Sequence, residues 1–522
     1  MRRVGIFGWG VVAPRSRNIE AFERNLTSSE SWLSPFNGFG PDNFLVGTPD
    51  FNLADYKPWI DERFPANRFS QLERKMGQPT QFAIGAFIQS LAQNPGLEQE
   101  LQALGPRAHV YVGTGLGDLP TIQAISLDLY RAQRRWDRFW SAPERNAVLR
   151  KWLETREPLA GLPPEPSSVE EGLRDEAEDA WWHFWTGHST ELREYLAELR
   201  DIEAIGVPDG ADVESAKLAV IKDKRTRNAR LQKKWSAPEP PWNAVSSNVL
   251  WNIHNTPASQ VSMLGQITGM TFAPVAACSS FGYGLKLAMN SLQLGEAKAV
   301  VMGMTDAAPS PLVVGGFYNA RVISADAAIS KPLTALRGTH IAGGAVVWVL
   351  GDYDYFTSKG FKPLGMEPVS VGVTADADHI ITPSKEGPTL AIREALAAAG
   401  CEASDVGSWD LHATATPGDY LEVQNLRDVL PESVLITARK GTFGHGMSAG
   451  GGWELTAQYL GYGRGQVFPT PLKKTELNQQ ISRVHGRFVF DEAVAAPAGC
   501  AGKLSMGVGG INACVISRPW KK

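Results

Sequence analysis

The chain has 522 residues, more than one simple core usually holds, so two or more packed units are expected. Its residues are 43% hydrophobic and 20% charged, a balance that fits a soluble globular protein rather than a disordered one. The formal net charge of −4 argues against a general nucleic-acid binder, and no apolar run is long enough to span a membrane.

The N-terminus places two arginines before an apolar stretch, as a signal peptide also does. This stretch, residues 4–12, is short, rich in glycine and β-branched residues, and is soon followed by Pro14. We therefore interpret it as a buried strand. The four cysteines form no CxxC pair and the nine histidines are scattered, so we expect no disulfide framework, no metal site and a cytoplasmic protein.

Short apolar runs alternate with helical patterns along most of the chain. In chain order they predict a strand at 4–12, a helix at 81–92, a strand at 109–113, a helix at 280–294, strands at 299–304 and 345–350, a helix at 388–399, a strand at 409–412, a helix at 419–429, a strand at 433–438, a helix at 449–462, and strands at 504–508 and 513–517. This alternation favours an α/β protein with largely buried sheets.

Residues 118–245 differ from the rest, because they are helical in pattern, charged and rich in tryptophan. Eight of the sixteen tryptophans lie there, and the pentapeptide Trp-Ser-Ala-Pro-Glu occurs twice, at 140–144 and 235–239. We interpret the segment as a helical insertion that uses the same turn twice, with proline closing one helix and opening the next. A lid or a partner-docking module is the alternative.

Cys278 is the first candidate for chemistry. An apolar β-type run leads up to it, and small residues then open a long helix, so the thiol faces a helix N-terminus. The partial positive charge there is expected to favour the thiolate, and Gly282 and Gly284 to reduce crowding around it. The arrangement is similar to a nucleophile elbow. A buried core cysteine is the alternative.

Two histidines follow predicted strands in the second part of the chain. His412 precedes a threonine-rich loop, and His445 lies in a glycine-rich loop that leads into a helix. Each alone fits a structural histidine. Together with Cys278 they form a Cys/His/His set that suits acyl transfer.

At this point the chain resembles the β-ketoacyl synthases of the thiolase superfamily, over about 1–117 and 246–522. The motifs that carry the resemblance lie, in the family's order, at 4–14, 111–117, 276–280, 294–304, 412–417, 440–445 and 507–513. The resemblance implies an α/β, five-layered αβαβα thiolase-like fold of two similar halves, at 1–352 with the insertion 118–245 and at 353–522.

The resemblance also implies roles. Cys278 would accept an acyl chain as a thioester, His412 and His445 would assist loss of carbon dioxide from a malonyl thioester, and Lys440 would hold the second histidine loop. The backbone N–H groups of Cys278 and Val508 would form an oxyanion hole. Residues implied to contact the substrate are Thr414, Thr416, Phe443, Gly509 and Gly510.

Some residues depart from the family pattern. Val508 stands where the family usually carries a large aromatic gate, which suggests a wider entrance unless Phe443 or Phe281 fills the space. Thr334, Gly338 and Gly344 stand where carboxylates are expected.

The function that follows is an acyltransferase of the 3-oxoacyl synthase type in a specialised fatty-acid or polyketide-like pathway. A thiolase-fold acyltransferase without decarboxylation and a non-catalytic partner subunit remain alternatives. The expected partners are an acyl carrier protein or coenzyme A thioester and a second copy of the chain, with no cofactor. Candidate contacts for an acidic carrier are Arg68, Arg74, Lys75 and the run 222–230.

Overall fold

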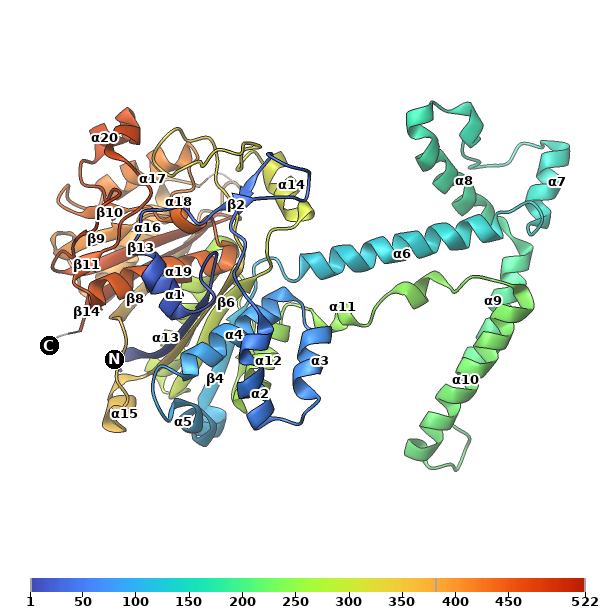
Figure 1. Cartoon of the computed structure of the whole chain (residues 1–522), viewed down its shortest axis with the longest axis horizontal. Helices are drawn as coiled ribbons and strands as arrows, with labels where there is room; N and C mark the ends of the chain where they lie inside the picture. The colour runs from blue at the N-terminus through green and yellow to red at the C-terminus, as the bar shows by residue number, and fades with distance from the viewer. Residues whose placement is uncertain (1, 381–382, 521–522) are drawn as a thin grey trace. The chain divides into compact units, whose positions relative to one another are not determined.

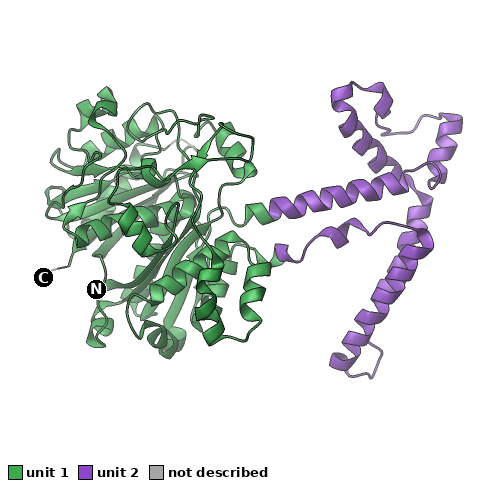
Figure 2. Cartoon of the chain, viewed as in Figure 1, with its two compact units in different colours: residues 1–121, 250–522 green, residues 122–249 purple. Residues whose placement is uncertain are grey.

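The computed structural model describes residues 2–380 and 383–520 and divides into two compact units (Figure 2). Unit 1 comprises residues 1–121 and 250–522, and unit 2 comprises residues 122–249. The bounds of unit 2 differ by four residues at each end from those of the predicted insertion at 118–245. The predicted division into halves at residue 352 does not appear as two separate units, because the halves share a layer of helices, and it stays a prediction.

Two five-stranded mixed sheets organise unit 1 (Figure 1). The first has the order β1-β7-β6-β4-β5, and the second has the order β10-β9-β13-β14-β8. Their strands are β1 (Val4–Val12), β4 (Ala108–Gly113), β5 (Thr271–Phe272), β6 (Ala299–Asp306) and β7 (Gly344–Asp352), then β8 (Met366–Ala375), β9 (Val406–Asp410), β10 (Leu435–Thr437), β13 (Cys500–Gly507) and β14 (Ile511–Pro519).

The two sheets have the same topology. Numbered within each sheet in chain order, both read 3-2-4-5-1 from one edge to the other. The pairing directions also match, since strands 3, 2 and 4 are parallel to one another in each sheet while strand 5 pairs antiparallel to its neighbours. This repeat confirms the expected two similar halves.

Helices cover both faces of each sheet and complete five layers. Helices α13 (Ser280–Leu294) and α19 (Met447–Gly463) pack against each other and against strands of both sheets. The outer layers contain α4 (Gln78–Leu91) and α12 (Thr256–Gly265) on the first sheet, and α16 (Glu386–Ala399) on the second. Every residue of β1, β6 and β7 is buried, as expected for strands covered on both faces. The αβαβα fold is therefore confirmed.

Shorter elements complete unit 1. The helices are α1 (Ile19–Asn25), α2 (Lys57–Arg63), α3 (Arg68–Lys75), α5 (Leu97–Leu104), α11 (Asn248–Trp251), α14 (Pro311–Asn319), α15 (Tyr353–Ser358), α17 (Gly418–Arg427), α18 (Lys440–Phe443) and α20 (Gln479–Val484). The strand pairs are β2 (Ser34–Pro35) with β3 (Leu45–Val46), and β11 (Gln466–Val467) with β12 (Val494–Ala495). Across residues 2–380 and 383–520, no helix is both long and apolar enough to cross a membrane.

Unit 2 is helical, as predicted. Its helices are α6 (Leu119–Trp140), α7 (Ala147–Thr155), α8 (Arg174–His188), α9 (Thr190–Glu203) and α10 (Val213–Trp235). The two copies of the repeated pentapeptide end α6 and α10, and their tryptophans, Trp140 and Trp235, lie with ring centroids 5.9 Å apart. The repeat therefore terminates two helices whose ends meet in one aromatic cluster, which agrees with a turn used twice.

Candidate active site

Cys278 lies in a tight turn between β5 and α13. Ala277 immediately before it has a left-handed backbone with φ 47°, a conformation that a residue with a side chain rarely adopts. Ser280 stabilises this turn, since its hydroxyl donates to the Ala277 carbonyl at 2.6 Å and accepts from the Ala276 N–H at 2.8 Å. The structure thus places Cys278 on a strained elbow at the start of a helix, as the sequence predicted.

The start of α13 packs closely against both sheets. A Cβ atom added to Gly282 would lie only 2.5 Å from the Ala513 Cβ on β14, and one added to Gly284 would lie 2.9 Å from the Met304 side chain. The expectation that these glycines reduce crowding around the thiol is therefore wrong. They allow close packing of the helix, which fixes where the elbow presents Cys278.

Burial dominates the electrostatics of the Cys278 thiol. Burial raises its pKa to about 11, against an opposing effect of the nearby Lys440 ammonium, while the Asp306 carboxylate raises it further. The expected thiolate at the helix N-terminus is thus wrong for the protein without substrate, in which the thiol is protonated. The backbone N–H groups of Val508 and Cys278 lower the pKa, which places both of them at the sulfur.

His412 follows β9, and buried carboxylates hold its backbone. Glu422 accepts hydrogen bonds from the N–H groups of His412 at 2.6 Å and Ala413 at 2.8 Å. Asp419 accepts from the Thr414 N–H at 2.8 Å and continues the same pattern along the loop. Burial raises the pKa of Glu422 to about 7 and that of Asp419 to about 6. The predicted strand end at 412 is two residues too long, because β9 stops at Asp410.

His445 lies between α18 and α19 and is fixed on both sides. Its backbone N–H donates to the His340 carbonyl at 2.6 Å, and its carbonyl accepts from the Ala342 N–H at 2.8 Å. The Met447 N–H lies 3.2 Å from its Nδ1 atom. Because Nδ1 accepts this hydrogen bond, the proton of the neutral ring resides on Nε2.

The two imidazole rings meet edge to face, with centroids 5.3 Å apart and an interplanar angle of 82°. Burial lowers the pKa of both histidines well below 6.5, and the Lys440 ammonium lowers both further. Both rings are therefore neutral near pH 7, and each carries one N–H that can donate a hydrogen bond.

Lys440 is buried behind the histidines. Its ammonium donates to the His412 carbonyl and forms an ion pair with Glu454 at 2.8 Å. Lys503 binds the other oxygen of the same carboxylate, also at 2.8 Å. Sequence reasoning predicted Lys440 but missed Glu454 and Lys503. The only sequence signal was a single charged residue within an otherwise apolar helix or strand.

Cys278, His412 and His445 line one cavity of about 450 Å³. Its other lining residues are Phe317, Arg321, Val322, Thr339, Pro383, Ala413, Thr414, Thr416, Pro417, Gly418, Asp419, Leu421, Glu422, Met506, Gly507 and Val508. The structure therefore brings together a thiol, two neutral imidazoles and a pair of backbone N–H groups, the set that thioester chemistry requires.

Two family models match the chain. The C-terminal domain of β-ketoacyl synthases matches residues 367–472, and the N-terminal domain matches residues 218–354. The chain belongs to the β-ketoacyl synthase family.

Curated relatives are about 30% identical to this chain over part of its length. Nodulation protein E of Rhizobium meliloti is 32% identical over 41% of this chain and 54% of its own length. A 3-oxoacyl-[acyl-carrier-protein] synthase 2 of Vibrio cholerae is 30% identical over 42% of this chain and 55% of its own length. The chain thus spans about half the length of the curated relatives it matches.

Solved structures share the fold of this chain. The ishigamide ketosynthase/chain length factor has a TM-score of 0.69 at 18% identity, and a β-ketoacyl synthase from Burkholderia phymatum has 0.69 at 19% identity. Each comparison covers all of both chains. The architecture is therefore shared with ketosynthases far beyond the level of sequence similarity.

Not all of the expected substrate contacts line this cavity. Thr414 and Thr416 do, but Gly509 and Gly510 are not among the lining residues and form the turn between β13 and β14 instead. The expected substrate contact of Phe443 is not seen either, because its ring is fully buried against Trp32 and Trp453 and does not line the cavity.

Neither alternative aromatic fills the place of the missing gate. Phe443 is buried in its own aromatic cluster, and Phe281 packs edge to face on Trp348 with centroids 4.9 Å apart. Val508 itself lines the cavity and is 45% exposed. The cavity lining therefore carries a small and accessible side chain at this position.

Two of the positions that depart from the family pattern require glycine in this chain. Gly338 and Gly344 have φ values of 127° and 142°. A Cβ atom at Gly344 would lie 2.2 Å from the Val12 carbonyl oxygen. A carboxylate side chain does not fit at Gly344. The carboxylate that pairs with Lys440 is Glu454.

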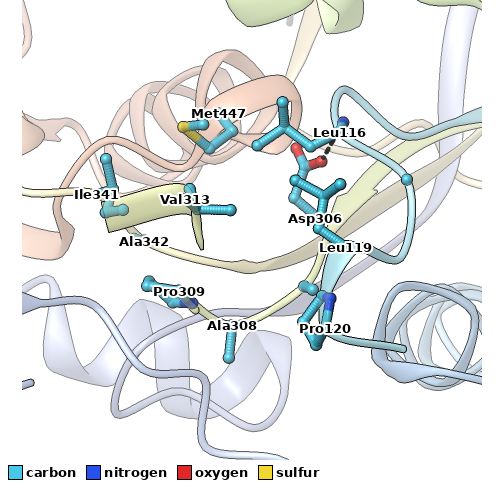
Figure 3. A pocket seen from close by; sticks show the side chains of 12 residues that line it. Leu116, Leu119, Pro120, Asp306, Ala308, Pro309, Val313, Ile341, Ala342 and Met447 are labelled. Carbon is cyan, nitrogen blue, oxygen red and sulfur yellow. Dashed lines mark hydrogen bonds between the residues drawn. The ribbon is translucent and has the colours of Figure 1, made fainter. Parts of the chain in front are cut away.

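Asp306 ties the first sheet to the start of α19. Its carboxylate accepts hydrogen bonds from the N–H groups of Gly115 at 3.0 Å, Leu116 at 3.1 Å and Ser448 at 2.8 Å. Beside it lies a small apolar pocket of about 10 Å³ (Figure 3), roughly the space that one water needs. This pocket is too small for a substrate, so Asp306 positions the helix that follows His445.

Proposed function

We propose that this protein is a condensing enzyme that transfers an acyl group to Cys278 and then joins it to a malonyl thioester with loss of carbon dioxide. The observation that carries the proposal is the single cavity lined by the Cys278 thiol and by two neutral histidines. A base alone would suffice for simple acyl transfer. Two neutral imidazoles that donate hydrogen bonds can stabilise an enolate oxygen without a proton transfer, which suits the condensation better than simple acyl transfer.

In the first step the Cys278 sulfur attacks the carbonyl carbon of the acyl donor. The N–H groups of Cys278 and Val508 stabilise the oxyanion that forms, an interaction typically worth several kcal/mol in the transition state. The bond to the donor sulfur then breaks. The proton of the Cys278 thiol passes to the departing donor thiolate, which leaves as a thiol.

In the second step the malonyl carboxylate leaves as carbon dioxide. The electron pair of the broken carbon–carbon bond forms an enolate, whose oxygen accepts hydrogen bonds from the ring N–H groups of His412 and His445. The enolate carbon attacks the acyl carbonyl on Cys278 and forms the new carbon–carbon bond. The sulfur leaves as a thiolate and takes a proton from solvent, which restores the thiol.

We further propose that the acyl donor is bound to an acidic carrier protein, in a fatty-acid or polyketide-like pathway, and that the enzyme is a homodimer. The solved complex of a type II PKS acyl-carrier protein with its ketosynthase contains a chain of similar fold, with a TM-score of 0.65 at 17% identity. Helix α3 offers Arg68, Arg74 and Lys75 as contacts, and the run 222–230 lies on α10. A coenzyme A thioester is the alternative donor.

Intact-mass spectrometry after incubation with acyl-carrier and coenzyme A thioesters tests the first step. We expect an acyl adduct that is lost in Cys278→Ala and retained in Cys401→Ala, which removes another buried cysteine outside the cavity. Carbon dioxide release from a malonyl thioester tests the second step. Acyl transfer without carbon dioxide would favour an acyltransferase, and no adduct with any donor would refute the proposal.

A further inference from the structure

A second buried lysine shares the carboxylate that pairs with Lys440. Lys503 lies on β13 with its side chain 1% exposed, and its ammonium is 2.8 Å from Glu454 Oε2, while Lys440 is 2.8 Å from Glu454 Oε1. Glu454, on α19, is also 1% exposed. One carboxylate therefore binds two ammonium groups, one on each oxygen.

Each lysine also binds the backbone that leads into the first histidine. Lys503 donates to the Leu411 carbonyl at 3.3 Å and to the carbonyl of Leu504, and Lys440 donates to the His412 carbonyl. With Glu454, all three N–H donors of Lys503 have acceptors. The two lysines thus hold the carbonyls of two consecutive residues directly after β9.

The buried ion pairs behind the histidines contain more cations than carboxylates. The buried Arg439 pairs with Asp410 at 2.9 Å, so three cations face Asp410 and Glu454. Burial acts to lower the pKa of Lys503, but Glu454, Asp410 and Glu422 outweigh it and raise the pKa. Lys503 is therefore charged, although an isolated buried ammonium would be strongly disfavoured.

We propose that Lys503 is a second positioning residue of the condensation site, which acts with Lys440 through Glu454 to fix the His412 backbone and keep both imidazoles neutral. This inference rests on the proposed function for its kinetic part only. The charged groups that act on the two histidines are Lys440 on α18 and Lys503 on β13, with Glu454 between them. The other charged or titratable groups at the same cavity are Cys278, Arg321, Asp419 and Glu422. Both ammonium groups lower the pKa of each histidine.

The direct test is the titration of His412 and His445 by nitrogen-15 NMR, with assignment from His412→Gln and His445→Gln. In the unmodified protein we expect both rings to stay neutral well below pH 6.5. Lys503→Met removes a positive charge, so their pKa values should rise by on the order of one pH unit. Lys503→Arg keeps the charge and should retain the low values. Lys298→Met, which breaks the ion pair with Asp352 on the first sheet, is the matched control and should change neither.

Carbon dioxide release from a malonyl thioester gives a second readout. We expect Lys503→Met to lower kcat roughly 10–100-fold, to leave KM unchanged and to move the acid limb of the pH profile upward, because the neutral rings are lost at higher pH. A structural role alone would lower activity without moving this limb. If Lys503→Met does not fold, Lys503→Gln serves as the neutral variant.

Unchanged histidine titration and an unchanged acid limb in a folded neutral variant would overturn the inference. If the unmodified protein neither acylates Cys278 nor releases carbon dioxide, the proposed function fails. The titration still decides the role of Lys503 in that case.

Discussion

Replacing Gly282 with alanine tests how closely α13 must approach β14 to present Cys278. The new Cβ would lie 2.5 Å from the Ala513 Cβ, whereas carbon atoms in contact are about 3.5–4.0 Å apart, so helix and strand must separate by roughly 1 Å. Such overpacking costs about 1–3 kcal/mol of the free energy of unfolding. Alanine recovers about 0.5–1 kcal/mol as a better helix former than glycine. We expect a net loss of roughly 1–2 kcal/mol.

Thermal unfolding and the rate of Cys278 alkylation by iodoacetamide measure the two effects of Gly282→Ala. Adding Ala513→Gly frees the space, so the double variant should recover most of the stability and the alkylation rate. The matched control is Gly316→Ala on α14, where a Cβ meets no atom within 4 Å and stability should not fall. If the losses of the two single variants simply add in the double variant, the two sites are not coupled and the packing argument is refuted.

Three further predictions concern the thiol, the entrance and unit 2. Because the pKa of Cys278 is about 11, its alkylation rate should keep rising with pH beyond the range in which an exposed cysteine levels off; a plateau near pH 9 would contradict this. Val508→Phe should slow acylation by long acyl donors more than by acetyl donors, as measured by intact mass, and an equal effect on both would argue against a gate at this position. Trp140 is 1% exposed, so Trp140→Ala should cost about 3–5 kcal/mol in urea unfolding of unit 2, and Trp140→Phe, which keeps most of the ring contacts, clearly less; equal losses would contradict the described core.

Much of the fold could be predicted because its strands are local apolar runs. The predicted strand at 4–12 matches β1, and the helix at 280–294 matches α13. The short β5 and the partly exposed β8 were missed, since two residues carry no periodicity and β8 has exposed positions. Which strands become neighbours depends on contacts distant in sequence, so the order within each sheet came from the structure alone.

The candidate site also has parts that the sequence could predict and parts that only the packing of distant segments determines. Cys278, His412 and His445 lie in short motifs, so the sequence could name them. The pKa of Cys278 could not be predicted from its helix N-terminus, because burial by distant segments outweighs that local effect. Lys503 lies 49 residues after Glu454 in the sequence, and only the packing of β13 on α19 joins them.

Because the two sheets have the same strand order, Cys278 and His445 occupy equivalent positions in the two halves. Each lies after the third strand of its half and before the helix that leads to the fourth strand, Cys278 before α13 and His445 before α19. At this shared position one half thus presents a thiol and the other an imidazole, and both line one cavity. In the proposed reaction this makes the capture of one substrate and the activation of the other the separate tasks of two related halves.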